Sequence, residues 1–307
     1  MHANNYTDLP DRDSWLAYRA EEGAHRIGAS AVGAILGVSA WTSPTDVWLQ
    51  HQPGYVQPPP SAAMLDGIAW EPIALQLYAQ RTGLRVETHP HRVYRHPDAP
   101  WLGATLDGLA LDGGDWLVVE VKTDRTAGAA QAWPQDGARV DVVDLDCPEA
   151  CPIPPAYWLQ VQTQLACAGL DRAHVVVCLP RFGLLMPEMR IIEVTAQPYG
   201  DVLRALTRWR AEHLLGGVRP DPTSPEEREA FARWLYPERA VKRDATDAEA
   251  EAIARLLDLR DQRDAADASF SSLRAEVVMG MGDAAEIRCN AGKLAVGKRG
   301  VTVTRAK

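Results

Sequence analysis

Three charged residues near the middle of the chain have the types and spacing expected of phosphodiester chemistry. Glu120 and Lys122 end the apolar run 116–119, and residues two apart in a strand point to the same face. Asp107 ends another short strand candidate thirteen residues earlier. Because a turn at 112–115 returns the chain, we expect Asp107 and Glu120 to lie side by side.

The chemistry predicted for this group depends on a divalent cation. Clustered carboxylates repel each other and are costly to desolvate, and Mg²⁺ or Mn²⁺ prefers such hard oxygen ligands together with water and a substrate phosphate. A lysine beside them can hold the attacking water and stabilise the charge that develops in hydrolysis. The alternative for the same residues is a solvated strand end without catalytic function.

Two further features add polar groups to this prediction. Glu71 interrupts the apolar stretch 67–75 of a predicted helix, although an exposed glutamate favoured by the helix dipole is the structural alternative. Tyr157, Gln160 and Gln164 follow helical spacing and form one polar stripe. Solvent-facing amides are the alternative for that stripe.

The elements that must position these residues follow from periodicity, caps and turn residues. Helices are predicted at 12–25, 31–37 with Ser30 as N-cap, 45–50, 65–81, 156–168, 197–215 and 246–279. Strands are predicted at 92–95, 101–105, 174–179 and 189–194, with hairpins at 109–122 and 286–305. Residues 124–155 have no clear period and are interpreted as a long active-site loop or an insertion. We therefore predict an α/β domain over 1–222 and an extension over 223–307 that holds a long helix and a basic β-hairpin.

Composition limits the class of protein. The 307 residues are 46% hydrophobic and 24% charged, which is typical of a globular protein. No apolar run is long enough to span a membrane, and the N-terminal residues lack the apolar centre of a secretory signal. Five irregularly spaced cysteines favour a reduced, cytoplasmic location. A net charge of −9 argues against a general DNA-coating protein but permits an enzyme with a local basic groove.

Several other chemistries are disfavoured by the spacing of their residues. Cys147 and Cys151 lie far from the other cysteines, so a four-cysteine cluster is not expected. The histidines at 89, 91 and 96 have no cysteine pair beside them, which argues against zinc. No P-loop, GxGxxG or GxSxG motif is present, so unwinding driven by ATP would have to come from another protein.

Six short motifs, taken in their order along the chain, resemble those of the YqaJ-like viral recombinases, the lambda-type exonucleases of the PD-(D/E)XK nuclease superfamily. They cover residues 26–213, about two-thirds of the chain. They are Arg26-Ile27-Gly28-Ala29-Ser30, Leu36-Gly37-Val38-Ser39-Ala40-Trp41, the helix with Glu71, Leu106-Asp107-Gly108, Glu120-Val121-Lys122 and Tyr157-Trp158-Leu159-Gln160-Val161-Gln162. The resemblance implies a restriction-endonuclease-like core, a mixed central β-sheet flanked by helices.

The resemblance also implies roles for individual residues. Mg²⁺ or Mn²⁺ would be held by Glu71, Asp107, Glu120 and the carbonyl of Val121. Lys122 would orient the nucleophilic water, and Gln160 would lie near that water or the phosphate. A pocket for a 5′-terminal phosphate would be formed by Arg26, Ser30 and Thr105. The alternatives without a binding function are a surface charge for Arg26 and a helix cap for Ser30. Tyr157 and the turn residue Trp41 are candidates for DNA contacts.

The function implied by the resemblance is 5′→3′ resection of duplex DNA ends. It would leave 3′ single strands for annealing recombination with a single-strand annealing protein, inside a bacterial or phage-infected cell. A ring-shaped homotrimer is compatible with the family. A structure-selective endonuclease or nickase on the same core and a non-catalytic DNA-binding scaffold remain alternatives. For residues 223–307, partner docking, oligomer contact and DNA contact all remain open.

Overall fold

A computed structural model describes residues 5–21, 25–126, 128–141, 151–179, 188–222, 228–229, 242–297 and 300–305. The chain divides into two compact units, residues 1–237 and 238–307. The predicted boundary after residue 222 stays a prediction, because residues 223–227 and 230–241 are outside the described ranges. Within those ranges, every helix is too short or too polar to cross a membrane.

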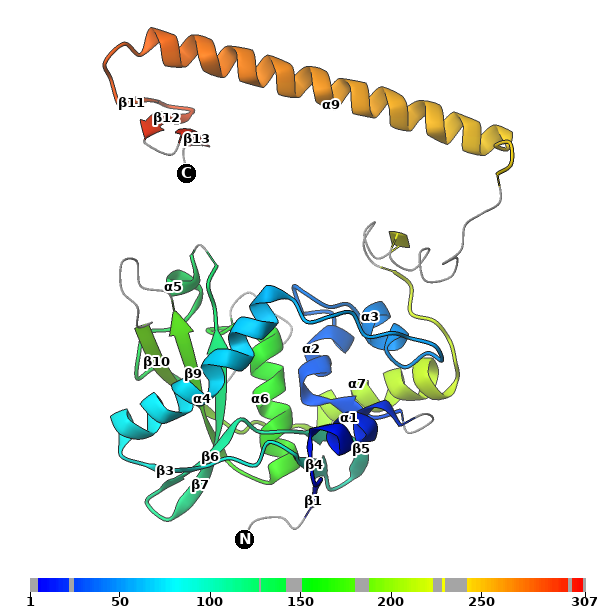
Figure 1. The fold of residues 1–307 in the computed structure, drawn as a ribbon, viewed down its shortest axis with the longest axis vertical. Coiled ribbons are helices and arrows are strands. Elements are labelled where there is room, and N and C mark those ends of the chain that lie inside the picture. The colour runs from blue at the N-terminus through cyan, green and yellow to red at the C-terminus, as the bar shows by residue number, and fades with distance from the viewer. Residues whose placement is uncertain are drawn as a thin grey trace. The chain divides into compact units, whose positions relative to one another are not determined.

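The first unit is built around a six-stranded mixed sheet (Figure 1). Its strands, in spatial order, are β3 (Arg85–Glu87), β6 (Gly108–Asp112), β7 (Asp115–Thr123), β9 (Arg172–Leu179), β10 (Glu188–Thr195) and β8 (Arg139–Val140). The central pair β7 and β9 is parallel, whereas β6 and β7 form the predicted antiparallel hairpin. Central strands buried on both faces read as continuous apolar runs, as β7 and β9 do.

A second, four-stranded sheet lies in the same unit. Its order is β1 (Tyr6–Asp8), β4 (Arg92–His96), β5 (Ala99–Ala104) and β2 (Ile27–Gly28). β5 ends only a few residues before β6 begins, so the chain passes from one sheet to the other through Thr105, Leu106 and Asp107. The expected mixed α/β architecture with flanking helices is therefore confirmed.

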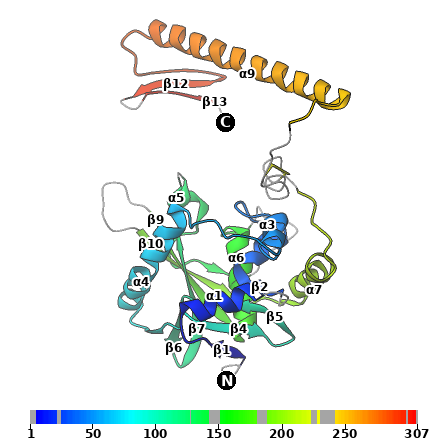
Figure 2. The same cartoon turned by 45° about the vertical axis from the view of Figure 1, so that its right-hand side comes forward.

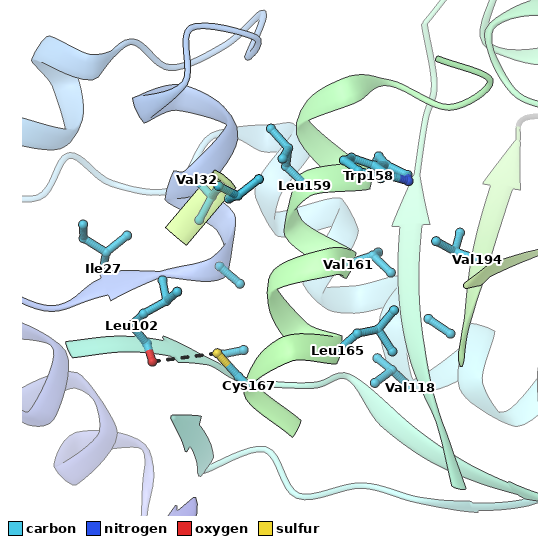
Figure 3. Close-up of a cluster of buried hydrophobic side chains, with 14 of the residues drawn as sticks. Ile27, Val32, Leu102, Val118, Trp158, Leu159, Val161, Leu165, Cys167 and Val194 are labelled. Atoms are coloured by element: carbon cyan, nitrogen blue, oxygen red, sulfur yellow. Dashed lines mark hydrogen bonds between the residues drawn. The ribbon is translucent and has the colours of Figure 1, made fainter. Parts of the chain in front are cut away.

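Helix α6 (Pro155–Ala168) lies between the two sheets and is buried along most of its length. Val161 and Leu165 belong to the same apolar cluster as Val118 of β7 and Leu102 of β5 (Figure 3). Gly169 takes a left-handed conformation and ends the helix, as its position after the periodic run predicts. Since both sides of α6 are apolar, its few polar residues must find partners inside the protein.

Helix α4 (Ala62–Thr82) covers the opposite face of the six-stranded sheet (Figures 1 and 2). Ala74, Leu75 and Tyr78 pack there against a second apolar cluster that includes Leu117 and Val119 of β7. Ser61 caps the first turn and Gly83 ends the last turn in a left-handed conformation. β7 is therefore buried on both faces, by α4 on one side and by α6 on the other.

The described part of this unit contains several further helices, of which α2 (Val32–Ile35) packs against α6. The others are α1 (Arg12–Ala20), α3 (Pro44–Leu49), α5 (Ala129–Ala132) and α7 (Gly200–Trp209), the last continued by a π-helical turn at Arg210–Leu215. Ser43 and Asp46 form a reciprocal capping box at the start of α3. The expectation that Ser30 caps a helix is wrong, because it lies inside a 3₁₀ turn, Ala29–Ala31, and no side chain caps that turn.

A glycine allows α2 to approach α6 closely. A Cβ added at Gly33 would lie 2.7 Å from both Cα and Cβ of Ala156. We therefore expect Gly33→Ala to lower the free energy of unfolding by about 1–3 kcal/mol, since backbone must move to accept the methyl group. Urea unfolding measures the change, with Gly28→Ala as the control because nothing lies within 4 Å of a Cβ there. Equal stabilities for the two variants would contradict the close approach.

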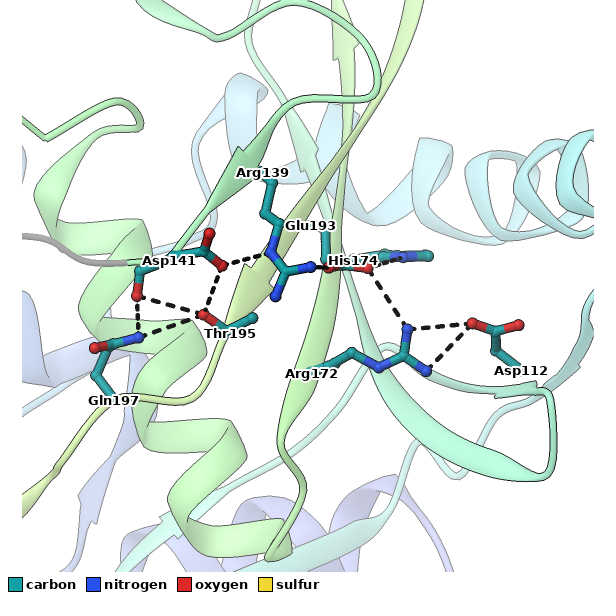
Figure 4. Close-up of polar contacts among 8 residues, drawn as sticks. All are labelled: Asp112, Arg139, Asp141, Arg172, His174, Glu193, Thr195 and Gln197. Atoms are coloured by element: carbon teal, nitrogen blue, oxygen red, sulfur yellow. Dashed lines mark hydrogen bonds and ion pairs between the residues drawn. The ribbon is translucent and has the colours of Figure 1, made fainter.

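The 124–155 stretch is only partly the loop that was predicted. It contains α5 and the short strand β8, which pairs in parallel with β10, while residues 142–150 lie outside the described part. At this sheet edge, a row of alternating charges runs from Asp112 through Arg172, Glu193 and Arg139 to Asp141 (Figure 4). These contacts tie β6, β9, β10 and β8 together on the face that α4 also covers.

The second unit contains a long helix and a small sheet. Helix α9 spans Asp247–Gly280 and begins with a capping box between Thr246 and Glu249. The strands that follow are β11 (Glu286–Cys289), β12 (Gly292–Gly297) and β13 (Gly300–Arg305). The predicted terminal hairpin is therefore a three-stranded antiparallel sheet, because the chain turns a second time after Gly297.

Candidate active site

Glu120 is the buried centre of a polar cluster on the α6 face of β7. Its side chain is 2% exposed, although Val119 and Val121 on either side of it face α4. The solvated strand end considered from the sequence is therefore wrong for this residue. A carboxylate buried to this extent requires partners that compensate its lost hydration.

The two oxygens of Glu120 receive such partners from β7 and α6. Lys122 Nζ lies 2.5 Å from Oε1, and Gln160 Nε2 donates to the same oxygen over 2.5 Å. Gln164 Nε2 donates to Oε2 over 2.5 Å and to the carbonyl of Thr105 over 3.2 Å. The predicted polar stripe of α6 thus faces Glu120 rather than solvent.

Gln162 leaves this stripe, as its spacing predicts. Its amide donates to the carbonyl of Thr195 and accepts from the backbone of Gln197. Gln164 belongs to the predicted polar stripe, but the sequence did not indicate it as a site residue. In the structure it donates directly to Glu120, as Gln160 does. Its spacing of four residues from Gln160 on the same helix face was the available signal.

Asp107 lies in the connection between β5 and β6, beside the end of β7. Its Oδ2 accepts a hydrogen bond from the backbone N–H of Val121 over 2.8 Å. The expectations that Thr105 belongs to a strand and that Asp107 ends one are wrong, since β5 ends at Ala104 and β6 begins at Gly108. The expected proximity of Asp107 to Glu120 is nevertheless found, because the hairpin returns the chain as predicted.

The electrostatics of the cluster reflect burial and crowded carboxylates. Burial and the charge of Glu120 together hold the pKa of Asp107 well above its ordinary value. The pKa of Glu71, on α4, is raised by burial and then by Glu120. Burial alone would lower the pKa of Lys122, but Glu120 and Asp107 outweigh it and the pKa is raised. Lys122 is therefore a charged ammonium at neutral pH that partly balances three carboxylates.

Tyr157 joins this cluster to a group of stacked aromatic rings. Lys122 Nζ lies 4.8 Å from the centre of the Tyr157 ring, a cation–π distance. Trp41 and Trp133 stack on Tyr157 with ring centres 5.1 and 5.6 Å away. Trp41 is 63% exposed, whereas Trp133 is buried and donates to Asp124 over 2.9 Å. An exposed indole is thus fixed beside the polar cluster.

A buried arginine holds the segment that carries Trp133. Arg190 of β10 donates to the carbonyls of Ala130, Trp133 and Pro134 over 2.8–3.1 Å and to Glu188 over 2.7 Å. Only 5% of its side chain is exposed. Neither Trp133 nor Arg190 was predicted as a site residue. The one sequence signal for these hydrogen bonds was a single arginine in the apolar strand Met189-Arg190-Ile191-Ile192.

The three residues predicted to bind a terminal phosphate have other contacts. Arg26 donates to the carbonyl of Tyr18, pairs with Glu21 and stacks on the Tyr18 ring. Ser30 is exposed in its 3₁₀ turn, and Thr105 is half-buried, with its carbonyl facing Gln164. The contacts of Arg26 are made to α1 and its end, so the pocket stays a prediction.

The oxygen atoms of the cluster determine whether it can hold a divalent cation. Within the described ranges, no three carboxylate, imidazole or thiol groups converge into a ready cation site. Asp107 and Glu120 nevertheless offer two hard-oxygen groups, and the charge of Glu120 raises the pKa of Asp107. The N–H and C=O of one strand residue point to the same edge, so the Val121 carbonyl faces the Asp107 side. Gln164 Oε1, buried without a hydrogen-bond partner in the structure, suits a cation-bound water. These donors fit Mg²⁺ or Mn²⁺.

Comparison with models of known protein families identifies one family. A model of the YqaJ-like viral recombinase domain matches residues 14–171. An uncharacterized protein, YqaJ of Bacillus subtilis, is 25% identical over 256 residues, which are 82% of this chain and 72% of that protein. Among solved structures, the chain resembles LHK-Exo, an alkaline exonuclease from Laribacter hongkongensis, at 19% identity and a TM-score of 0.48. A structure of LHK-Exo with dAMP gives 21% identity and a TM-score of 0.49, and each alignment covers 74% of this chain and 100% of the other.

Proposed function

Because the chain belongs to the YqaJ-like viral recombinase family, we propose that it is a metal-dependent DNA exonuclease that resects duplex ends. The observation that carries the proposal is the buried cluster of Asp107, Glu120 and Lys122 at the end of β7. A structural protein gains nothing from burying crowded carboxylates, which are costly to desolvate. The expected polarity is 5′→3′, leaving 3′ single strands for annealing recombination.

The cation would be held by Asp107, Glu120 and the carbonyl of Val121, with Glu71 supporting a second position. When bound, Mg²⁺ or Mn²⁺ supplies Lewis-acid stabilisation of the phosphoryl oxygens and a more acidic water. Gln160 and Gln164 fix both oxygens of Glu120 from α6, so that this carboxylate is oriented before substrate arrives. Such preorganisation lowers the cost of reaching the transition state.

Lys122 is the group proposed to act on the nucleophile. Its ammonium lies between Glu120 Oε1 and Gln160 Oε1, at 2.5 and 3.1 Å, so two of its three N–H bonds have partners in the protein. The third is available to hold a water or a phosphate oxygen. The raised pKa of Lys122 keeps it charged, and it therefore orients the water and stabilises negative charge rather than accepting a proton.

Trp41 and Tyr157 are proposed to contact the DNA end. The exposed ring of Trp41 presents a flat apolar face that a base can stack on. Arg26, Ser30 and Thr105 are proposed as the 5′-phosphate pocket, because guanidinium and hydroxyl groups suit phosphate chemically. A single-strand annealing protein is the proposed partner, in the cytoplasm of a bacterial or phage-infected cell. A homotrimer around the DNA is compatible with this activity.

The experiment that tests the function is cleavage of linear duplex DNA labelled at one end, with and without a 5′ phosphate at that end. It is run with Mg²⁺, Mn²⁺ or EDTA, beside Lys122→Ala and a closed circular duplex. We expect metal-dependent loss from the phosphorylated 5′ end, an intact circle and an inactive variant. Cutting of the circle would favour the endonuclease alternative. DNA binding without cleavage in the presence of either metal would favour the alternative of a non-catalytic DNA-binding scaffold.

Replacing Trp41 with alanine is expected to raise KM for duplex ends roughly tenfold and to leave kcat nearly unchanged, because one base-stacking surface is lost. The melting temperature should not change, since the indole is largely exposed. Trp41→Phe keeps an aromatic face and should recover most of the affinity. A fall in kcat with constant KM would instead place Trp41 in the chemical step.

Metal binding is expected to depend on pH through the buried carboxylates. The pKa of Asp107 is raised in the folded protein, so the metal-free protein keeps a proton that the unfolded chain releases near pH 4. Its stability should therefore fall as pH rises from that value to the folded pKa. In EDTA, Asp107→Asn should stabilise the protein more at pH 8 than at pH 4, and Mn²⁺ should raise the melting temperature of the wild type more at pH 8. If the stability of wild type and of Asp107→Asn changed with pH in the same way, the raised pKa of Asp107 would be contradicted.

A further inference from the structure

Most of helix α9 is exposed, although Val277 and Val278 near its C-terminal end are half-buried. It contains 34 residues, none of which is buried, and would extend over about 51 Å at 1.5 Å per residue. Helices in proteins obtain most of their stability from burying an apolar face rather than from intrinsic propensity. An exposed helix of this length with large apolar side chains therefore indicates that a surface remains to be covered.

The apolar side chains of α9 follow the spacing of a coiled-coil seam. Alternating steps of three and four residues connect the seam positions, which are Leu256, Leu259, Arg263, Ala266, Phe270, Leu273, Val277 and Gly280. The four largest apolar members, Leu256, Leu259, Phe270 and Leu273, are between 51% and 66% exposed. A seam that repeats every seven residues for more than three repeats is the pattern of helices that pair along their length.

We propose that α9 pairs in antiparallel orientation with α9 of a second copy of this chain. The register that we propose aligns the middle of the seam, between residues 264 and 265, with the same point of the partner helix. Leu256 then faces the partner's Leu273, and Leu259 faces the partner's Phe270. Arg263 then faces the partner's Ala266, so that a long side chain meets a small one at the centre. Complementary sizes at facing positions are what close packing of two helices requires.

The charges that flank the seam agree with this register and select its direction. Arg255 comes to lie opposite the partner's Glu276, and Arg260 opposite the partner's Asp267. By symmetry each attraction occurs twice in the dimer. In the parallel alternative, Arg255 would face the partner's Arg260, which places like charges together. Flanking charges of this kind determine partner choice and orientation in paired helices.

The central arginine adds specificity to the pairing. Arg263 occupies a seam position where an apolar residue would be more stable, and a single polar residue there fixes the register. Its aliphatic stem can cover the partner's Ala266 while the guanidinium remains in solvent. Within the single chain, Arg263 pairs with its neighbour Asp264 and Arg260 pairs with Asp261, and both contacts leave the seam open.

Cysteine cross-linking of the full-length protein tests the orientation directly. Leu256→Cys and Leu273→Cys proteins are mixed, oxidised and digested, and the disulfide between residues 256 and 273 is identified by mass spectrometry. We expect this mixed disulfide in good yield and little product from either variant alone. A control mixture of Leu256→Cys with Asp261→Cys, whose side chain points away from the seam, should give little. Efficient 256–256 and 273–273 products would overturn the antiparallel pairing, as would the absence of all seam products.

Charge reversal gives an independent test by sedimentation equilibrium. Arg255→Glu should weaken self-association through α9 by roughly 3- to 30-fold, because two attractions become repulsions. Arg255→Glu with Glu276→Arg should restore it. A parallel pair predicts the opposite sign for the single change. An association that neither change alters would overturn the proposal and favour a different partner for α9, and nuclease activity is not part of either readout.

Discussion

Replacing Glu120 with glutamine is expected to reduce DNA cleavage by about a thousand-fold or more without lowering stability. The amide has nearly the same shape, but it cannot balance Lys122 or bind a divalent cation as a carboxylate does. Its removal also relieves the repulsion that raises the pKa values of Asp107 and Glu71. The melting temperature in EDTA should therefore change little, because the relieved repulsion offsets the loss of the charge beside Lys122.

Single-turnover cleavage and thermal unfolding in EDTA measure the two effects of this change. Glu193→Gln is the matched control, because Glu193 lies on β10, separated from β7 by β9, in a charged row outside the cluster. It should leave cleavage within about twofold, as expected for a partly exposed ion pair. If Glu120→Gln retained full activity, Glu120 would not bind the cation. If the variant were inactive only because it unfolded, the assignment of Glu120 as a ligand would lose its support.

Replacing Arg190 with methionine is expected to lower the free energy of unfolding by about 3 kcal/mol. The guanidinium is the shared donor for the carbonyls of Ala130, Trp133 and Pro134, and these acceptors would remain buried without it. The segment that holds Trp133 against Tyr157 should loosen as a result. Because Tyr157 lies over Lys122, cleavage should also fall, by roughly tenfold, at temperatures where the variant is folded.

Chemical denaturation and cleavage assays of Arg190→Met are compared with those of Arg139→Met. Arg139 also lies at this edge of the sheet, but its side chain is 58% exposed and its partners are Asp141 and Glu193. Its loss should cost no more than about 1 kcal/mol and should leave cleavage unchanged. Similar losses for both variants would mean that Arg190 acts as an ordinary surface charge and does not hold the Trp133 segment.

Most of the regular elements could be predicted because their signals are local. Gly83 and Gly169 end α4 and α6 where the apolar period stops, and the turn at 112–115 places Asp107 near Glu120. The polar cluster around Glu120 was predictable for the same reason, since Glu120 and Lys122 lie two residues apart on one strand. The resemblance to a family then assigned roles that spacing alone does not give.

What escaped prediction depends on contacts between distant parts of the chain. The segment after β7 has no period of its own, and its shape follows from Arg190 and from Asp136, which accepts from the backbone of Ile191. The aromatic stack on Tyr157 joins residues 41, 133 and 157, which no spacing rule connects. Thr105 and Asp107 were predicted in strands, but they lie in the connection where the chain passes from one sheet to the other.

The position of α6 between the two sheets has a consequence for how the protein acquires activity. Glu120 is oriented by Gln160 and Gln164, and these residues are in place only when α6 has docked on strands that are distant in sequence. Contacts of such long range form late and slowly in folding. A nascent or partly folded chain would therefore carry Glu120, Gln160 and Gln164 without aligning them. If the proposed function is correct, degradation of DNA would be restricted to molecules that have completed folding, which would protect the cell that synthesises the protein.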